Sequence, residues 1–230
     1  MNCSKKKTVG LLTIGQSPRP DMTDDLLPIF GEKLEISEAG ALDGLTLEQV
    51  QNMAPEPGDH FLVTRMSDGT AVQVAAHHLT SLMQQQVARL EQSGVSAILI
   101  LCTEAFQPFD CTVPIVYPND VLKSQVPEHA VHGHIGVVLP DRGQITDFAA
   151  VWQNVVPQVD AVFGSPYASD GSLEAAAKYF AGTAVDLIVL DCMGYTTSMQ
   201  QRVAELSGKP VYLARTLAAQ HLVQLMSAQP

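Results

Sequence analysis

Two stretches of the sequence, SAILILCTEAF (residues 96–106) and VDLIVLDCMGYT (residues 185–196), have the same pattern. Each is a continuous apolar run of strand length that ends in a cysteine and then becomes polar. Continuous apolar runs are typical of strands that are buried on both faces of a parallel sheet. In open α/β sheets, ligands bind beyond the carboxyl ends of such strands. The pattern therefore predicts that Cys102 and Cys192 lie at two strand ends where a site is built.

Around these stretches, strand-like and helix-like segments alternate along the chain, and the two halves resemble each other. TVGLLTIG (residues 8–15) corresponds to IGVVLPD (residues 135–141), and AILILCTE (residues 97–104) corresponds to DLIVLDCM (residues 186–193). The alternation predicts an α/β fold with parallel sheets flanked by helices. The correspondence predicts two similar lobes with a cleft between them.

The alternation of strand-like and helix-like segments starts again at Ile135, and this restart gives the expected domain boundaries. We expect an N-terminal lobe of residues 1–117 plus 214–230 and a C-terminal lobe of residues 118–213. Seven or eight strands could also close a TIM barrel, but 230 residues with an internal restart favour two lobes.

Two helix starts have recognisable signals. Thr46 and Gln49 form the capping-box pattern before a short helix. Asp21 or Thr23 is expected to cap a helix over residues 22–30.

The composition narrows the class of protein. The net charge is −11, which argues against nucleic acid or anionic lipid as the main partner, because both need a basic surface. No stretch approaches the roughly 20 apolar residues of a membrane span, and the opening residues do not have the pattern of a signal peptide. The four cysteines, which include Cys3 and Cys111, form no C-x-x-C pair. We expect a cytoplasmic protein with free thiols.

Cys102 and Cys192 are the first candidates for chemistry. Backbone N–H groups and a helix dipole after each strand could lower the pKa of the thiols. Two thiols on opposite sides of a substrate could take a proton from one face of a carbon acid and return one to the other, a reaction that needs no cofactor. Cysteine is also a common apolar filler of cores, but the matched positions of this pair favour a function.

The residues beside the cysteines have two interpretations each. Thr103 and Glu104 could bind a substrate carboxylate or amine, and Glu104 could instead be a carboxylate at a helix N-terminus. Asp191 could raise the pKa of Cys192 or accept backbone hydrogen bonds at the strand end. Gly194, Tyr195 and Thr196 complete the second loop, in which a threonine could instead cap a helix.

The loop after the first strand offers a second set of binding residues. Gln16, Ser17 and Arg19 lie in a proline-stiffened segment, where an arginine is suited to a carboxylate or phosphate. Arg65 is the second cation candidate, with a surface ion pair as the alternative. No metal site is expected, because His129, His132 and His134 precede a strand instead of following one. These binding residues also support an alternative function, a non-catalytic protein that binds a small anion.

Three motifs resemble one family. TIGQSPRPD (residues 13–21), VTRMSDGT (residues 63–70) and LDCMGYT (residues 190–196) resemble the AroM family over nearly the full length. That family is associated by name with aromatic amino-acid biosynthesis, which links the anion-binding alternative to that metabolism.

More distantly, the layout is similar to the aspartate/glutamate racemase superfamily, which includes hydantoin racemases and maleate isomerases. Those proteins are two-lobed α/β enzymes with one cysteine per lobe and no cofactor. The resemblance implies a racemase or isomerase that acts on a small carboxylic acid, with Cys102 and Cys192 as the acid–base pair and Thr103 as a carboxylate contact. Related folds often dimerise, so a homodimer is one alternative, but no heptad or apolar stripe in the sequence identifies an interface and the oligomeric state stays open. Glutamate racemases follow the two cysteines with Asn-Thr and Thr-His, whereas this chain has Thr-Glu and Met-Gly.

Overall fold

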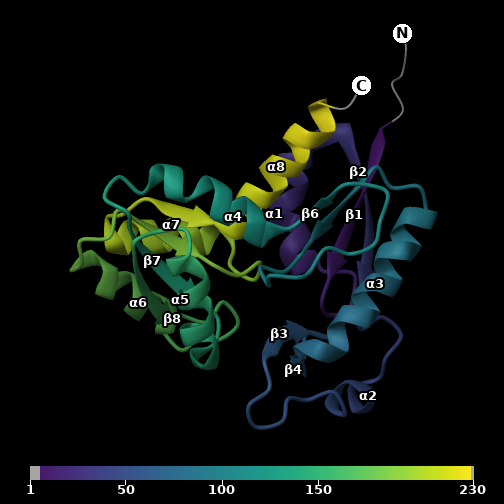
Figure 1. Cartoon of the computed structure of the whole chain (residues 1–230), viewed down its shortest axis with the longest axis horizontal. Coiled ribbons are helices and arrows are strands. Elements are labelled where there is room, and N and C mark those ends of the chain that lie inside the picture. Colours follow the sequence, from purple (N-terminus) through teal and green to yellow (C-terminus); the bar gives the residue numbers. More distant parts are fainter. Residues whose placement is uncertain (1–5, 229–230) are drawn as a thin grey trace. The chain divides into compact units, whose positions relative to one another are not determined.

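The computed structural model describes residues 6–228 and divides them into two compact units (Figure 1). The first unit contains the described residues up to Tyr117 together with those from Ala219 onward, and the second is Pro118–Ala218. Cys3 lies outside the described residues.

The first unit is built on a four-stranded parallel sheet. Its strands are β1 (Lys7–Thr13), β2 (Leu34–Gly40), β5 (Ala97–Ile100) and β6 (Ile115–Val116), in the order β2-β1-β5-β6. All four residues of β5 are buried, which explains its uninterrupted apolar sequence.

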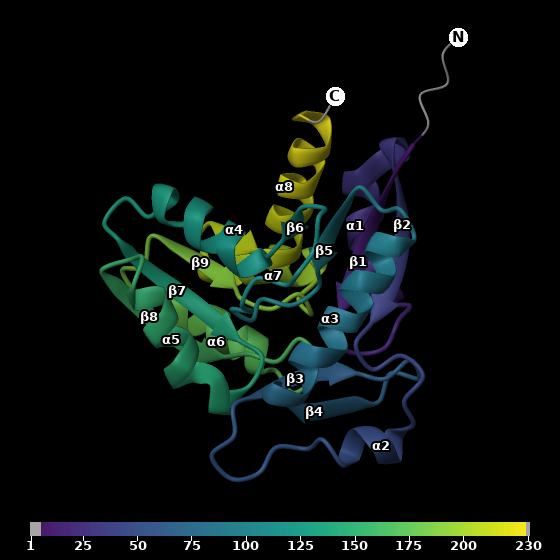
Figure 2. The same ribbon diagram turned by 45° about the vertical axis from the view of Figure 1, so that its right-hand side comes forward.

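Two long helices flank this sheet. The connections through α1 (Pro20–Phe30) and α3 (Ala76–Gln92) cross the sheet in opposite directions, so right-handed crossovers place them on opposite faces. Helix α3 lies alongside β1 and β2 (Figure 2). The 3-10 turn η1 (Gly31–Lys33), the short helix α2 (Leu47–Gln51) and an antiparallel pair, β3 (Phe61–Arg65) and β4 (Ala71–Ala75), complete the unit.

The second unit repeats this plan. Its strands β7 (His134–Leu139), β8 (Gln158–Phe163), β9 (Leu187–Leu190) and β10 (Val211–Leu213) form a parallel sheet in the order β8-β7-β9-β10. This is the order of the first sheet, with β7 in the place of β1 and β9 in the place of β5.

The helices of the second unit follow the same crossover rule. Helix α5 (Ile145–Gln153) is on one face, and α6 (Ser172–Ala181) and α7 (Thr197–Ser207) pack together on the other. The unit begins with α4 (Pro118–Gln125). The remaining elements are η2 (Pro127–His129), η3 (Arg142–Gln144) and α8 (Ala214–Ala228), which starts in the second unit and ends in the first.

The structure confirms the predicted α/β class, with two similar units of parallel strands flanked by helices. It also confirms the capping box of Thr46 and Gln49. The expected cap of α1 is wrong: Arg19 occupies the cap position without a side-chain bond, because Asp21 pairs with that arginine instead.

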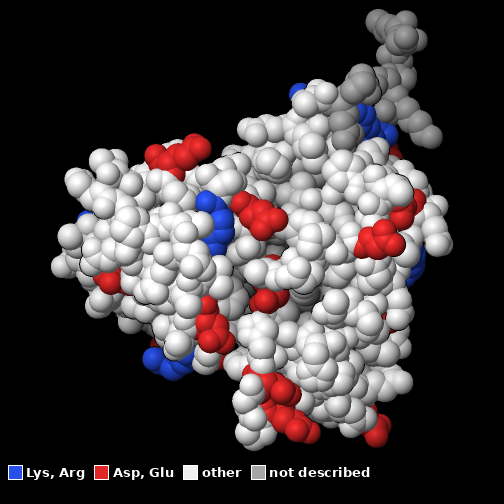
Figure 3. Space-filling view, in the orientation of Figure 1, with Lys and Arg blue, Asp and Glu red and all other residues white. Residues whose placement is uncertain are grey.

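Charge and hydropathy agree with the composition. Figure 3 shows acidic side chains scattered over one face and few basic ones, so this face has no continuous basic surface. Among the helices within residues 6–228, none has the length and apolar character needed to cross a membrane.

Candidate functional site

The two cysteines occupy equivalent positions in the two sheets. β5 pairs with β1 up to Ile100, and β9 pairs with β7 up to Leu190. Cys102 and Cys192 each come two residues after the last paired residue, at the carboxyl end of an inner strand. Each unit therefore has one partly buried thiol at the edge where parallel sheets build their sites.

The backbone turn around each sulfur is also the same. The N–H of Glu104 donates to Cys102 Sγ at 3.5 Å, and the N–H of Gly194 donates to Cys192 Sγ at 3.3 Å. In both cases the donor is two residues beyond the cysteine. A backbone N–H aimed at sulfur stabilises the thiolate, so each turn provides one element of an activated thiol.

The segment after Cys102 differs from one expectation. It runs without helix to β6, so the interpretation of Glu104 as a helix N-terminal carboxylate is wrong. The Glu104 carboxylate instead pairs with His60 Nε2 at 2.9 Å. Thr103, which separates Cys102 from Glu104 in the chain, is buried. All three cysteines that the structure describes, including Cys111, are free thiols, as expected.

Gln16 holds three segments of the first unit together. Its side-chain amide donates to the carbonyls of Leu42 and Leu45 at 3.1 and 2.8 Å, and its Oε1 accepts the N–H of Ser67 at 2.8 Å. Its own N–H donates to the carbonyl of Arg65. These bonds place the loop after β1 against the β2–α2 and β3–β4 connections, which gives Gln16 a structural role.

Close backbone approach at this point requires glycine. A Cβ on Gly15 would lie 2.4 Å from the carbonyl oxygen of Arg65 and 2.4 Å from Thr64 Oγ1. Arg65 is partly buried at the end of β3. Its carbonyl accepts the N–H of Gln16 and faces Gly15, so its main chain takes part in this close contact.

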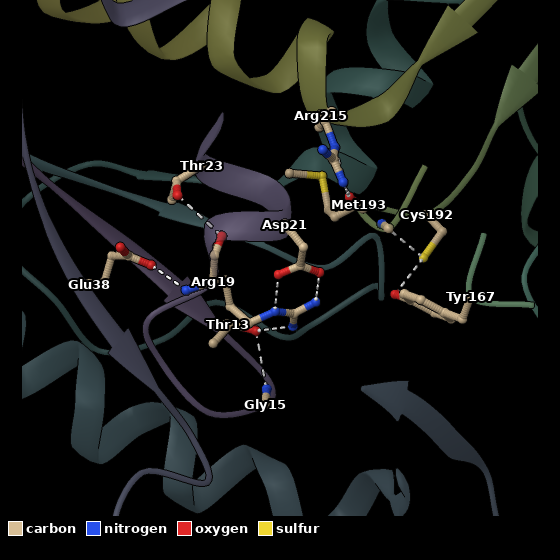
Figure 4. A network of polar contacts seen from close by, with 11 residues as sticks. Thr13, Gly15, Arg19, Asp21, Thr23, Glu38, Tyr167, Cys192, Met193 and Arg215 are labelled. Atoms are coloured by element: carbon tan, nitrogen blue, oxygen red, sulfur yellow. Dashed lines mark hydrogen bonds and ion pairs between the residues drawn. The ribbon is translucent and has the colours of Figure 1, made fainter. Parts of the chain in front are cut away.

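Ser17 and Arg19 each bind a carboxylate of the protein. Ser17 donates both its N–H and its hydroxyl to Asp43, at 2.7 Å each. Arg19 is 3 % exposed, and its Nε and Nη2 donate to the two carboxylate oxygens of Asp21 at 2.8 and 2.7 Å (Figure 4). Its Nη1 donates to Thr13 Oγ1. The guanidinium fork that was expected to hold a substrate anion is thus already occupied by Asp21.

Cys192 lies near Tyr167, which is in the loop between β8 and α6. The hydroxyl of Tyr167 is 3.7 Å from Cys192 Sγ (Figure 4), and a Cβ at Gly194 would lie 2.4 Å from the same hydroxyl. Gly194 therefore leaves the space that lets Tyr167 reach the thiol.

The protonation of Cys192 is set mainly by burial. Burial raises the pKa of the Cys192 thiol, while the N–H of Gly194, the Tyr167 hydroxyl and the charge of Arg215 lower it and Asp191 raises it. The backbone N–H of Gly194 lowers this pKa, as expected, but the net shift is upward because burial outweighs the donors. Helix α7 begins only at Thr197, five residues beyond the thiol. The expected effect of Asp191 is confirmed.

Two further residues of this loop support the backbone. The hydroxyl of the buried Tyr195 donates to the carbonyl of Gly164 at 2.6 Å, and burial raises the pKa of Tyr195 well above its usual value. Thr196 Oγ1 accepts the N–H of Met199 and caps α7. The interpretation of a threonine as a helix cap is therefore confirmed.

Sequence reasoning missed two side-chain partners of Asp191, which are Trp152 and Lys123. Asp191 is 2 % exposed, and its Oδ2 accepts the indole N–H of Trp152 at 2.6 Å and lies 3.9 Å from Lys123 Nζ. Lys123 is 12 % exposed, and Nζ lies 3.2 Å from the centroid of the Trp152 ring. The three come from α4, α5 and the end of β9, so no sequence motif joins them.

Arg215 was also missed. It is buried at the start of α8, and its Nε and Nη2 both donate to the carbonyl of Met193, next to Cys192, at 2.9 and 2.5 Å (Figure 4). A buried cation fixed to this turn gives the second unit a positive group near its thiol. The sequence signal is an arginine in a helix, α8, that has no other Lys, Arg, Asp or Glu.

Comparisons with known proteins place the chain in a family and identify structures with a similar fold. A model of the family described as AroM protein matches residues 9–226. A comparison with curated proteins found no match.

Solved structures with the same fold are similar to the chain over nearly its whole length. An allantoin racemase from Klebsiella pneumoniae has a TM-score of 0.62 at 13% identity, covering 97% of this chain and 88% of that one. A glutamate racemase from Bacillus anthracis has a TM-score of 0.61 at 12% identity, covering 97% and 83%. The maleate isomerase of Pseudomonas putida S16 has a TM-score of 0.59 at 13% identity, covering 97% and 94%. At these identities the likeness is one of fold.

Proposed function

Since the chain belongs to the AroM protein family and has the fold of racemase-like proteins, we propose that it is a cofactor-independent racemase- or isomerase-type enzyme. It acts on a small carboxylic acid, with Cys102 and Cys192 as the acid–base pair. The observation that carries the proposal is the duplicated turn, in which each unit presents a thiol two residues beyond its inner strand with an N–H donor aimed at the sulfur. A core filler would not need the same turn twice.

The two thiols have different roles at the start of a reaction. Burial raises the pKa of Cys192, so this residue holds its proton near neutral pH and is the donor. Cys102 is then the base that removes a proton from the substrate carbon, and the Cys192 proton goes to the opposite face of that carbon. The reverse reaction exchanges the roles and restores both sulfurs, so protons balance without a cofactor.

The substrate contacts follow from the same arrangement. We propose that Thr103 and the backbone N–H groups after the cysteines, including that of Gly194, hold the carboxylate. Gln16, Ser17, Glu104, Tyr195 and Thr196 shape the loops around it through the bonds described above. Arg65 contributes positive charge at the end of β3, which weakens the repulsion that an acidic protein exerts on an anion. Arg19, neutralised by Asp21, holds the loop after β1 in place.

The alternative is a non-catalytic small-anion-binding protein linked to aromatic amino-acid metabolism. It depends on Arg19 as the anion-binding group, and a ligand would have to displace the Asp21 carboxylate from both of its bonds to Arg19. The duplicated thiols have no role in that alternative. We extend the enzyme proposal to a homodimer, because racemase-like folds often dimerise. We also propose a cytoplasmic location, which suits cysteines that act as thiols.

The test is solvent isotope exchange. The protein is incubated in deuterium oxide with the small carboxylic acids glutamate, aspartate and maleate, and with allantoin as a carbon acid without a carboxylate, and deuterium at carbon is followed by NMR. We expect exchange in one acid that is lost in Cys102→Ser and in Cys192→Ser. Cys111→Ser is the matched control, since Cys111 is a free thiol that does not follow an inner strand. Exchange that persists in both site variants would refute two-thiol chemistry.

A further inference from the structure

Lys123 is a partly buried cation that no step of the proposed reaction uses. Its ammonium group lies on the ring face of Trp152 and 3.9 Å from Asp191 Oδ2, the oxygen that also accepts the indole N–H. Trp152 is fully buried and thus fixes both partners. Asp191 immediately precedes Cys192 in the chain, and its charge raises the pKa of the Cys192 thiol, so the charge of the cluster acts on that thiol.

We propose that Lys123 is a positioning residue whose charge, held between Trp152 and Asp191, controls how readily the Cys192 thiol ionises. The Asp191 carboxylate opposes a negative charge on the neighbouring sulfur, and the ammonium group of Lys123 offsets that carboxylate. With Lys123 charged, the Asp191–Lys123 pair is neutral. With Lys123 uncharged, one negative charge remains behind the thiol and disfavours the thiolate.

The cluster changes its charge just above neutral pH. Burial lowers the pKa of Lys123 to about 8, in opposition to Asp191, which raises it. The other groups that act on Cys192 are the Gly194 N–H, the Tyr167 hydroxyl and Arg215, which all favour the thiolate. As pH rises through about 8, the loss of charge on Lys123 therefore works against the ionisation of the thiol.

Trp152 is the single tryptophan of the chain, so its fluorescence reports on this cluster. Fluorescence is recorded between about pH 6 and pH 9, where tyrosines with an ordinary pKa of about 10 remain largely protonated. We expect a transition near pH 8 in the unaltered protein and none in Lys123→Met. Lys123→Arg, which keeps the charge, is expected to hold the low-pH signal throughout. The same transition in Lys123→Met would overturn the assignment.

The second measurement is alkylation of Cys192 by iodoacetamide, followed by peptide mass spectrometry. At about pH 7.5 we expect Lys123→Met to slow alkylation roughly threefold to tenfold, as a pKa rise of half to one unit requires. Asp191→Asn keeps an oxygen for the Trp152 N–H and is expected to accelerate it, and the double variant is expected to return toward the original rate. Cys111, in the other unit, is the internal control.

These outcomes do not depend on the substrate. Equal Cys192 alkylation rates in Asp191→Asn and the unaltered protein would overturn the proposal, even if Lys123→Met failed to fold. The inference rests on the proposed function only for its consequence in catalysis. If no acid exchanges deuterium but both charge effects are present, the proposed function fails and the control of Cys192 stands.

Discussion

Replacement of Gly194 by alanine tests the contact between Tyr167 and Cys192. The added Cβ would lie 2.4 Å from the Tyr167 hydroxyl oxygen, 2.6 Å from Cζ and 2.9 Å from Cε1, whereas ordinary contact begins at 3.4 Å. The tyrosine ring must therefore move away by about 1 Å, or the loop between β9 and α7 must shift. Overpacking of this kind costs about 1–3 kcal/mol of folding free energy. We expect Gly194→Ala to lower the free energy of unfolding in urea by that amount.

The same change should alter the thiol. The Tyr167 hydroxyl lowers the pKa of Cys192, so its withdrawal raises that pKa further and slows alkylation at neutral pH. Tyr167→Phe removes the hydroxyl without overpacking and is expected to slow alkylation with little loss of stability. Gly182→Ala is the matched control in the same unit, because its Cβ would meet only the Tyr179 carbonyl, at 3.7 Å. If Gly194→Ala and Gly182→Ala have the same free energy of unfolding and the same rate of Cys192 alkylation, the reasoning about this contact is refuted.

Three further outcomes are expected. Gln16→Ala removes three side-chain hydrogen bonds, one buried and two partly buried, and should lower the free energy of unfolding by about 2–4 kcal/mol in urea titrations; no change would contradict its structural role. Thr196→Ala should cost about 1 kcal/mol as a lost helix cap, with Thr196→Ser close to the original stability, and the reverse ranking would favour a substrate contact. The folded state holds Lys123 at a pKa of about 8 against 10.5, so the unfolded chain binds more protons between these values and stability should rise with pH there, by about 3 kcal/mol in total. Lys123→Met should lack this rise.

The fold could be predicted because its signals are local and periodic. The runs that became β5 and β9 are apolar throughout, since these strands are buried on both faces. The two similar halves of the sequence fold into two sheets with equivalent strand orders. The cap of α1 could not be predicted from residue type, because Asp21 has two partners within reach and pairs with Arg19 instead of the helix N-terminus.

The site was predictable only in part. Strand ends locate Cys102 and Cys192, because a sequence pattern shows where an apolar run stops. The role of Gln16 was hidden, since two of its partners are backbone carbonyls 26 and 29 residues away. The Lys123–Trp152–Asp191 cluster was hidden for the same reason: its members meet only after α4 and α5 have packed beside the sheet.

The division of α8 between the units bears on the order in which the protein is completed during synthesis. The second unit is one continuous stretch, whereas the first also needs residues 219–228, which include the carbonyl of Met226 that accepts a bond from Lys7 Nζ at 3.2 Å. A ribosome therefore delivers the whole of the second unit before it delivers the last part of the first. The unit whose strands are made first is therefore completed only when residues 219–228 have also been made.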